Sequence, residues 1–212
     1  KALEQSGQAD NTIVIFTADN GPEGYAYRRD EVFDHWSSEP FRGLKRDIYE
    51  GGHHVPFIVK WPGLTKAGST CEKLVSQIDF MATVASSLGY ELPDDAAEDS
   101  HDLLPLLQGE KANPRTGHVH NTRESAWAIR VGEWNLIEGK SGYHSRVHKN
   151  WETKRNYPAD DKDPVELYHY AKDPSQRVNL AKKFPKKVAE LQKELQVARE
   201  RGFTAPRLLN NE

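Results

Sequence analysis

The sequence contains one cysteine, Cys71, and no long apolar run. A single thiol excludes an internal disulfide framework and any zinc site built from several cysteines. No stretch approaches the roughly 18 apolar residues of a membrane-spanning helix, and the opening residues KALEQSGQADN lack the apolar core of a signal peptide. We therefore expect neither a disulfide-stapled nor a membrane-embedded fold, and no membrane partner.

Charge of one sign is also lacking. The 29 Lys and Arg residues nearly balance the 32 Asp and Glu residues, which leaves a formal net charge of −3. A general nucleic-acid binder would be strongly basic, so no nucleic-acid partner is predicted. Hydrophobic residues make up 36% of the 212 residues and the mean hydropathy is −0.80, which indicates a globular chain with a polar surface and a modest core.

Apolar runs and turn residues alternate through the first half of the chain. The run at residues 12–17 is continuous, β-branched and aromatic, which is typical of a strand buried on both faces of a parallel α/β sheet. Ligands bind at the carboxyl ends of such strands, and here that end is the turn at residues 18–22. The other elements predicted in this half are a long polar loop over residues 21–44, a second apolar strand over 55–63, and a helix that Asp79 caps and Gly89 ends.

The second half has shorter elements. Its predicted strands are residues 118–121, 126–131, 134–138 and 166–170, with a two-residue hairpin at Gly132-Glu133. Residues 139–165 form a long polar insertion. A helix is predicted from about Pro185, because the apolar residues 188, 191, 195 and 198 share one face. The pattern predicts an α/β fold that ends in a small four-stranded antiparallel sheet with a packed helix.

Asp19 and Asn20 lie in the turn after the first predicted strand. A carboxylate beside an amide carbonyl suits a hard cation such as Ca²⁺ or Mg²⁺, and a turn lets neighbouring side chains converge on one ion. Because Ca²⁺ takes about six to eight oxygen ligands, the others would have to come from elsewhere. The same two residues also fit an ordinary Asx turn before Gly-Pro.

Lys45 is the second candidate. A lysine beside a metal site offers a point charge to an anionic substrate, although a solvated surface lysine would look the same in the sequence. Gly51 and Gly52 are expected to allow a close backbone approach or a positive φ. The adjacent His53 and His54 are expected to have structural or surface roles, because successive side chains on an extended chain point apart.

Six segments, in this order, resemble signature blocks of the sulfatase family within the alkaline-phosphatase-like superfamily. They are residues 12–22 (TIVIFTADNGP), 42–63 (with RGLK, YEGG and VPFIVKWPG), 76–79 (SQID), 99–109 (DSHDLLPLLQG), 128–137 (AIRVGEWNLI) and 166–180 (ELYHYAKDPSQRVNL). No single segment identifies the family, but six in the family's order do. The chain resembles the C-terminal half of an arylsulfatase-like enzyme.

The resemblance implies a fold and a chemistry. Residues 1–110 would be the C-terminal part of an alkaline-phosphatase-like mixed-sheet catalytic domain, and residues 111–212 an antiparallel-sheet subdomain with a terminal helix. Sulfatases hydrolyse sulfate esters or sulfamates with a formylglycine nucleophile, made from the Cys or Ser of a C/S-x-P-x-R motif, beside a bound Ca²⁺. By resemblance, Asp19 and Asn20 are metal ligands, and Lys45 is a catalytic residue that contacts the sulfate.

The resemblance also leaves gaps. Cys71 has neither the Pro nor the Arg of the nucleophile motif, and we assign no nucleophile motif to this chain. The family's early acidic metal ligands and its further active-site His and Lys are also missing. We therefore expect an N-terminal half to supply them and this chain alone to be inactive. His54 stands where the family often has Arg. A periplasmic or secreted location is implied by the family.

Two stretches carry aromatic and cationic residues that suit a sulfated sugar, because rings stack on pyranoses and cations hold anionic groups. The loop after Asn20 should border the pocket, and residues 140–155 are a second candidate subsite. Both stretches also fit solvated surface loops. The residues predicted to bind substrate are Lys45, Arg28, His35 and Trp36, with Tyr25, Tyr27 and Arg29 in the same loop.

The predicted function is hydrolysis of a sulfate ester, on a sulfated carbohydrate in preference to a small aryl sulfate. Two alternatives stay open. One is a phosphodiesterase or phosphonate hydrolase of the same superfamily, which the nucleophile motif would distinguish. The other is a non-catalytic module that binds sulfated glycans, which heparin binding without turnover would favour.

Overall fold

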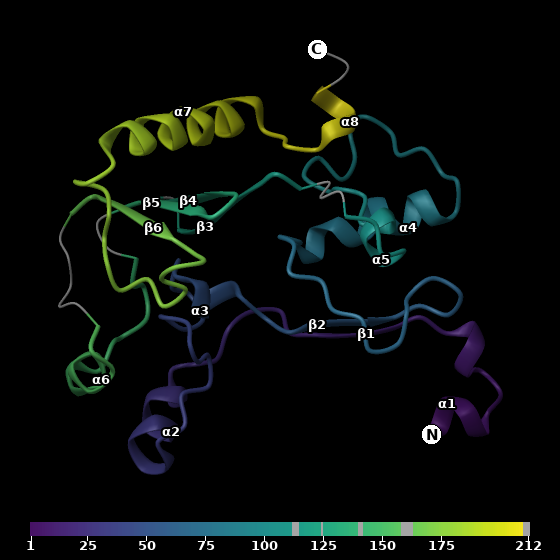
Figure 1. The fold of residues 1–212 in the computed structure, drawn as a ribbon, viewed down its shortest axis with the longest axis horizontal. Coiled ribbons are helices and arrows are strands. Elements are labelled where there is room, and N and C mark those ends of the chain that lie inside the picture. The colour runs from purple at the N-terminus through teal and green to yellow at the C-terminus, as the bar shows by residue number, and fades with distance from the viewer. Residues whose placement is uncertain (112–114, 124, 140–141, 158–162, 210–212) are drawn as a thin grey trace. The chain divides into compact units, whose positions relative to one another are not determined.

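The computed structural model describes residues 1–111, 115–123, 125–139, 142–157 and 163–209. The chain forms two compact units, which are treated separately here (Figure 1). Unit 1 is Lys1–Thr17, Pro56–Thr116 and Ala198–Glu212, and unit 2 is Ala18–Val55 and Gly117–Val197. The domain boundary expected between residues 110 and 111 stays a prediction.

Unit 1 contains a two-stranded antiparallel ribbon. Strand β1 (Val14–Thr17) pairs with β2 (Phe57–Lys60), and Phe16 lies opposite Ile58. Phe16 is 60% exposed and Ile58 is 62% exposed. The strands were predicted correctly, but the expectation that the first is buried on both faces of a parallel sheet is wrong for this chain. The reason is that the described residues provide no third strand beside the pair and no cover for the Phe16–Ile58 face.

The other elements of unit 1 are short. They are α1 (Ala2–Gln5), η1 (Ala9–Asn11), η2 (Gln77–Asp79), α4 (Phe80–Ser87), α5 (Leu104–Leu107) and α8 (Pro206–Leu209). The helix predicted after Asp79 is confirmed as α4, and Gly89 follows it with a φ of +65°. The buried Asp79 carboxylate accepts a hydrogen bond from the Ser76 backbone N–H at 2.8 Å and another from Arg115 Nε at 3.0 Å.

Unit 2 is built on the predicted four-stranded antiparallel sheet. Its strands are β3 (Gly117–Arg123), β4 (Ala126–Val131), β5 (Trp134–Glu138) and β6 (Val165–His169), in the order β3-β4-β5-β6. The hairpin between β4 and β5 is also confirmed, because Val131 pairs with Trp134 and Gly132 has a φ of +55°. A positive φ at the first of two loop residues is the geometry for which glycine is favoured.

Each face of this sheet is covered. On one face lies the predicted C-terminal helix, α7 (Pro185–Arg201), whose Leu191 and Leu195 pack on Ile129, Leu136 and Leu167 (Figure 1). On the other face, the chain around α3 (Glu50–His53) packs through Ile48 and Tyr49. The sheet residues below them are Ala126, Ala128, Ile137 and Tyr168. The alternation of strand side chains thus gives one face to α7 and the other to residues 42–53.

Two stretches predicted to be polar loops contain helices. Helix α2 (Tyr25–Phe33) lies within residues 21–44, and α6 (Lys149–Arg155) lies within residues 139–165. The loop prediction is wrong over these residues because a small aromatic core holds both helices. Tyr27, Trp36, Trp151 and Tyr157 are buried together there.

Candidate functional site

The turn after β1 and the segment that carries Lys45 are joined by backbone hydrogen bonds within unit 2. The Gly21 N–H donates to the Gly52 carbonyl at 2.8 Å, and the Lys45 N–H donates to the Pro22 carbonyl at 2.9 Å. The structure therefore brings the Asp19-Asn20 pair and Lys45, which are separated by 25 residues in the sequence, onto neighbouring backbone.

Three glycines make this contact possible. A Cβ on Gly21 would lie 1.8 Å from the Gly51 carbonyl oxygen. A Cβ on Gly51 would lie 2.3 Å from the Gly43 carbonyl oxygen, and one on Gly52 would lie 2.1 Å from that of Asp47. The close backbone approach predicted for Gly51 and Gly52 is confirmed, and Gly21 shares it.

The exposed face of the turn offers oxygen ligands. The Asp19 side chain is exposed and Asn20 is half-buried. Asn20 Nδ2 donates to the Gly21 carbonyl at 3.0 Å, which leaves its Oδ1 as an acceptor. Among the described residues, the Asp19 carboxylate has no hydrogen-bond or ion-pair partner. This donor pair fits a hard cation, but no group of three or more His, Cys, Asp or Glu in the described ranges could hold a metal ion, so the pair would form only part of a site.

Lys45 is held by an acidic neighbour that sequence reasoning missed. Its Nζ lies 3.1 Å from Glu23 Oε1, and Arg46 Nη1 lies 2.9 Å from Glu23 Oε2. Hydrogen bonds from Arg46 and then Lys45 lower the pKa of Glu23 to about 2. The carboxylate therefore stays charged over the whole range in which an enzyme would work, and it fixes the direction of Lys45. A Glu directly after the Gly-Pro of the turn was the only available signal.

A buried arginine, Arg42, links the segment that carries Lys45 to the rest of unit 2. Arg42 is 1% exposed, its Nε donates to Tyr143 Oη at 2.6 Å, and its guanidinium lies 4.1 Å from the centroid of the Tyr49 ring. Tyr49 Oη in turn donates to Glu166 Oε2 at 3.0 Å. Nothing near Arg42 in the sequence reveals this role, because its partners come from the distant insertion and sheet.

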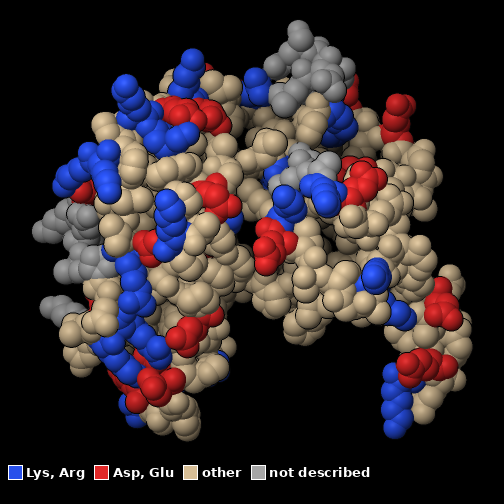
Figure 2. All heavy atoms as spheres, viewed as in Figure 1, with Lys and Arg blue, Asp and Glu red and all other residues tan. Residues whose placement is uncertain are grey.

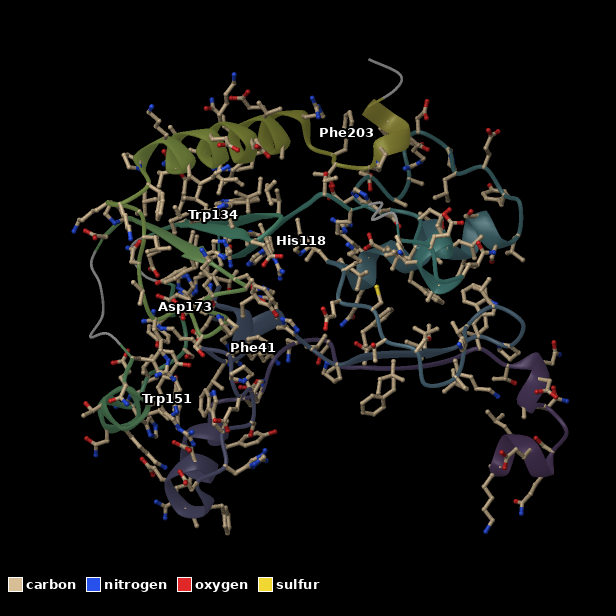
Figure 3. The ribbon with its side chains drawn as sticks, viewed as in Figure 1. Phe41, His118, Trp134, Trp151, Asp173 and Phe203 are labelled. Atoms are coloured by element: carbon tan, nitrogen blue, oxygen red, sulfur yellow. The ribbon has the colours of Figure 1, made fainter. Side chains whose placement is uncertain are left out.

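Histidines and a glutamate fill the space between α3 and the sheet. His54 Nδ1 lies 3.0 Å from the buried Glu50 Oε2, and the His54 ring stacks on Phe41 with centroids 4.1 Å apart. Figure 3 labels Phe41. The His53 ring lies tilted by 44° against the ring of His120 on β3, with centroids 4.1 Å apart, and burial lowers the pKa of His120 to about 3. The structural roles expected for His53 and His54 fit these contacts.

The residues predicted to bind substrate are placed differently from one another. Arg28 is exposed and pairs with Glu31 at 3.3 Å, and His35 is exposed. Trp36 is 4% exposed, donates its indole N–H to the Phe41 carbonyl at 2.9 Å, and has its ring centroid 4.4 Å from that of Trp151. In the described structure, Trp36 therefore supports the loop through packing, whereas Arg28 and His35 face solvent. None of the three makes a hydrogen bond or ion pair with Lys45 there.

In the second candidate subsite, residues 140–155, two basic side chains form ion pairs with carboxylates of neighbouring residues. Lys154 Nζ lies 2.8 Å from Asp34 Oδ1, and Arg155 pairs with the buried Asp30. Figure 2 accordingly shows basic and acidic side chains intermingled over α2 and α6. Lys140 lies outside the described residues.

One segment matches the sequence pattern of the nucleophile motif. Residues 38–42 read SEPFR, so the expectation that no part of this sequence matches C/S-x-P-x-R is wrong. Ser38 is 8% exposed and donates through Oγ to the Gly43 carbonyl at 3.1 Å. The Arg of the pattern is Arg42, which is buried among tyrosine side chains. A buried, bonded hydroxyl of this kind is a turn-forming group, not a nucleophile facing solvent.

Comparisons with known proteins agree with this arrangement. A family model described as Sulfatase matches residues 1–90. An N-acetylgalactosamine-6-O-sulfatase from Bacteroides thetaiotaomicron is 37% identical over 94% of this chain and 38% of its own length. Human arylsulfatase A is 32% identical over 84% of this chain and 35% of its own length. The chain thus spans about two fifths of the length of these relatives.

Solved structures give the same result. A sulfatase structure described in connection with the metabolism of multiple glycosaminoglycans by Bacteroides thetaiotaomicron is 33% identical. The match covers 93% of this chain and 41% of the sulfatase chain in that structure, with a TM-score of 0.75. A sulfatase from Pseudoalteromonas sp. shares the fold at 23% identity, with a TM-score of 0.70 over 93% of this chain. The predicted α/β fold class is confirmed. No helix within the described ranges is both long and apolar enough to cross a membrane.

Proposed function

From the premise that this chain belongs to the sulfatase family, we propose that the whole protein hydrolyses sulfate esters and that residues 18–53 carry part of its active site. The observation that carries the proposal is the junction of two segments. Backbone hydrogen bonds from Gly21 and Lys45 bring a carboxylate-amide pair suited to a metal and a lysine suited to an anion onto adjacent loops.

In this proposal, Asp19 and Asn20 hold a Ca²⁺ ion, with Mg²⁺ as the alternative hard cation. The ion supplies Lewis acidity and a template for the sulfate oxygens. Lys45 binds the sulfate as a point charge and stabilises the negative charge that develops on the leaving oxygen. Glu23 keeps the Lys45 ammonium, 3.1 Å away, in one direction.

The remaining parts of the site come from outside this chain. We propose that an N-terminal half of the protein supplies the formylglycine nucleophile and the other metal ligands. The exposed Phe16–Ile58 face of the β1–β2 ribbon supports such a partner, because an apolar face of this kind is buried in a stable protein. Peptide mapping of the whole protein should find formylglycine outside this chain and an unmodified Ser38. We also propose that the whole protein is exported, to the periplasm or outside the cell, because the family resemblance implies it.

The proposed substrate is a sulfated carbohydrate, with small aryl sulfates as poorer substrates. Identity of 37% to an N-acetylgalactosamine-6-O-sulfatase over 94% of this chain supports a sugar substrate, as do the exposed Arg28 and His35 beside the site loop. Trp36 contributes to binding by holding this loop in place.

The test is a turnover assay of the whole protein with three substrate classes. We expect release of sulfate from sulfated mono- and oligosaccharides at a higher kcat/KM than from 4-nitrophenyl sulfate. Activity confined to the aryl sulfate would overturn the carbohydrate assignment. Faster hydrolysis of bis-4-nitrophenyl phosphate than of any sulfate would favour a phosphodiesterase. Retention on heparin with no turnover at all would favour a glycan-binding module.

A further inference from the structure

The aromatic and basic residues of the loop after Asn20 fall into two sets. Tyr27 and Trp36 are 1% and 4% exposed and belong to the core of unit 2. Tyr25, at the start of α2, is 64% exposed, and Arg29 one helical turn later is also exposed. Residues four apart on a helix share a face, so Tyr25 and Arg29 form a paired surface.

The geometry of Arg29 fits a fixed cation beside a ring. Its Nη1 donates to Ser37 Oγ at 2.8 Å, and its Cζ lies 5.4 Å from the centroid of the Tyr25 ring. Both partners are uncharged. The guanidinium is thus oriented without being neutralised, and it keeps donors for another acceptor.

The neighbouring basic side chains form ion pairs with carboxylates. Arg28 pairs with Glu31, and Lys45 and Arg46 share the single carboxylate of Glu23. Lys154 and Arg155 pair with Asp30 and Asp34. In the part of the chain that the structure describes, Arg29 has no carboxylate partner. Of the described Lys and Arg side chains on α2 and on the Lys45 segment that are not buried, Arg29 is therefore the one without a carboxylate partner.

The helix that carries this pair is anchored on its opposite side. Lys154 Nζ donates to the Asp30 carbonyl at 2.9 Å, and the Tyr27 ring lies 5.4 Å from Trp151. The helix is also tied in sequence to the proposed site, because Tyr25 comes two residues after Glu23, which holds Lys45 at 3.1 Å. A ring and a cation on such a rigid support are pre-organised for binding.

We propose that Tyr25 and Arg29 form a subsite for an anionic pyranose next to the sugar that loses its sulfate. Tyr25 packs against the face of the sugar ring, and Arg29 binds the carboxylate or sulfate that this ring carries. The inference rests on the proposed function, because it names the substrate as a chain of at least two sugars with an anionic second residue.

The experiment compares two substrates of the whole protein, a sulfated disaccharide that contains a uronate and 4-nitrophenyl sulfate. In Tyr25→Ala and in Arg29→Ala, the ratio of kcat/KM for the disaccharide to kcat/KM for the aryl sulfate should fall about tenfold, through KM. Tyr25→Phe should keep most of the ratio. Tyr90→Ala, at a tyrosine of similar exposure outside this helix (63% exposed), is the matched control and should change nothing.

The outcomes that overturn the subsite are distinct from failure of the proposed function. An unchanged ratio in both variants overturns it, and so does an equal loss on both substrates with a lowered Tm, because Tyr25 would then be a packing residue. If the wild-type protein hydrolyses no sulfate ester, the proposed function fails. Calorimetric titration with the same disaccharide then decides the subsite: weaker binding by Arg29→Ala supports it, and equal binding or none by the wild type overturns it.

Discussion

The two sheets of this chain differ in how their faces are covered. The β1–β2 ribbon leaves Phe16 and Ile58 60% and 62% exposed, whereas the β3–β6 sheet has α7 on one face and residues 42–53 on the other. The residues proposed for catalysis are attached to different sheets. Asp19 comes directly after the open ribbon, and Lys45 lies on the segment that the covered sheet supports.

This difference explains what the chain can do by itself. The Lys45 segment has its full support in unit 2, through Arg42, Tyr49 and Glu166. No group of three or more His, Cys, Asp or Glu among the described residues could hold a metal ion beside Asp19 and Asn20. In the proposed function, the chain therefore supplies the segment that binds sulfate and only part of the metal site.

The largest expected effects separate these two parts in the whole protein. Asp19→Ala should remove bound Ca²⁺ and reduce turnover at least about a thousandfold, because it deletes a charged metal ligand. Lys45→Ala should retain the metal and lower kcat about 100- to 1000-fold. Metal content by elemental analysis and sulfate release measure the two quantities. If both variants keep the wild-type rate, the site lies elsewhere.

The backbone junction gives the next effect. Gly21→Ala would place a Cβ 1.8 Å from the Gly51 carbonyl oxygen, so the turn and the Lys45 segment must move apart. A displacement of about 1 Å can cost about 100-fold in rate. Gly24→Ala is the matched control, because a Cβ there meets nothing within 4 Å. Equal activity of the two variants would show that the junction does not matter.

A smaller loss is expected at Glu23, which positions Lys45. Glu23→Gln removes the charge that holds Lys45 and Arg46 and should lower kcat about tenfold, less than Lys45→Ala does. KM for an aryl sulfate and bound Ca²⁺ should stay as in the wild type, and Glu23→Asp should recover part of the rate. A fall in Tm of Glu23→Gln that accounts for the lost activity would argue for a purely structural role.

The smallest effect concerns stability and pH on the covered sheet. Burial holds the pKa of His120 at about 3, below its ordinary value of about 6.5 in the unfolded chain. Below pH 6.5 the unfolded state takes up a proton that the folded state refuses, so stability falls as pH drops from 6.5 towards 3. The loss between pH 7 and pH 5 should be about 2 kcal/mol.

Chemical denaturation of the wild type and of His120→Gln at the two pH values measures this contribution. The variant should lose less stability on acidification than the wild type does. His53 and His144, whose pKa values burial also lowers, should contribute to the remaining loss. His35→Gln, at an exposed position, is the control and should behave as the wild type. Identical pH dependence in all three proteins would refute the role of His120.

The sequence predicted those parts of the fold whose signals are local. The β3–β6 sheet and α7 were predicted because alternation, a glycine hairpin and a helical stripe each lie within a few residues. The contact between the glycines was likewise predicted at Gly51 and Gly52.

Features that depend on distant partners could not be predicted. The hydrogen-bond partners of the buried Arg42 are Tyr143, Tyr168 and the Gln176 carbonyl, which lie 101, 126 and 134 residues later in the chain. Helix α2 looked like a polar loop because its buried Asp30 is matched by Arg155 from another polar stretch. The exposure of the ribbon face was not predicted, because an apolar run does not show whether a partner covers it. Near Lys45, the role of Glu23 was not predicted, because its partner Arg46 is distant in the chain.

The most direct test of the account is turnover of 4-nitrophenyl sulfate with added Ca²⁺ by the purified 212-residue chain beside the whole protein. We expect repeated turnover by the whole protein and none by the chain alone, because the proposed function assigns the nucleophile and the other metal ligands to an N-terminal half. Multiple turnovers by the pure chain would contradict it and would place a complete site within these residues.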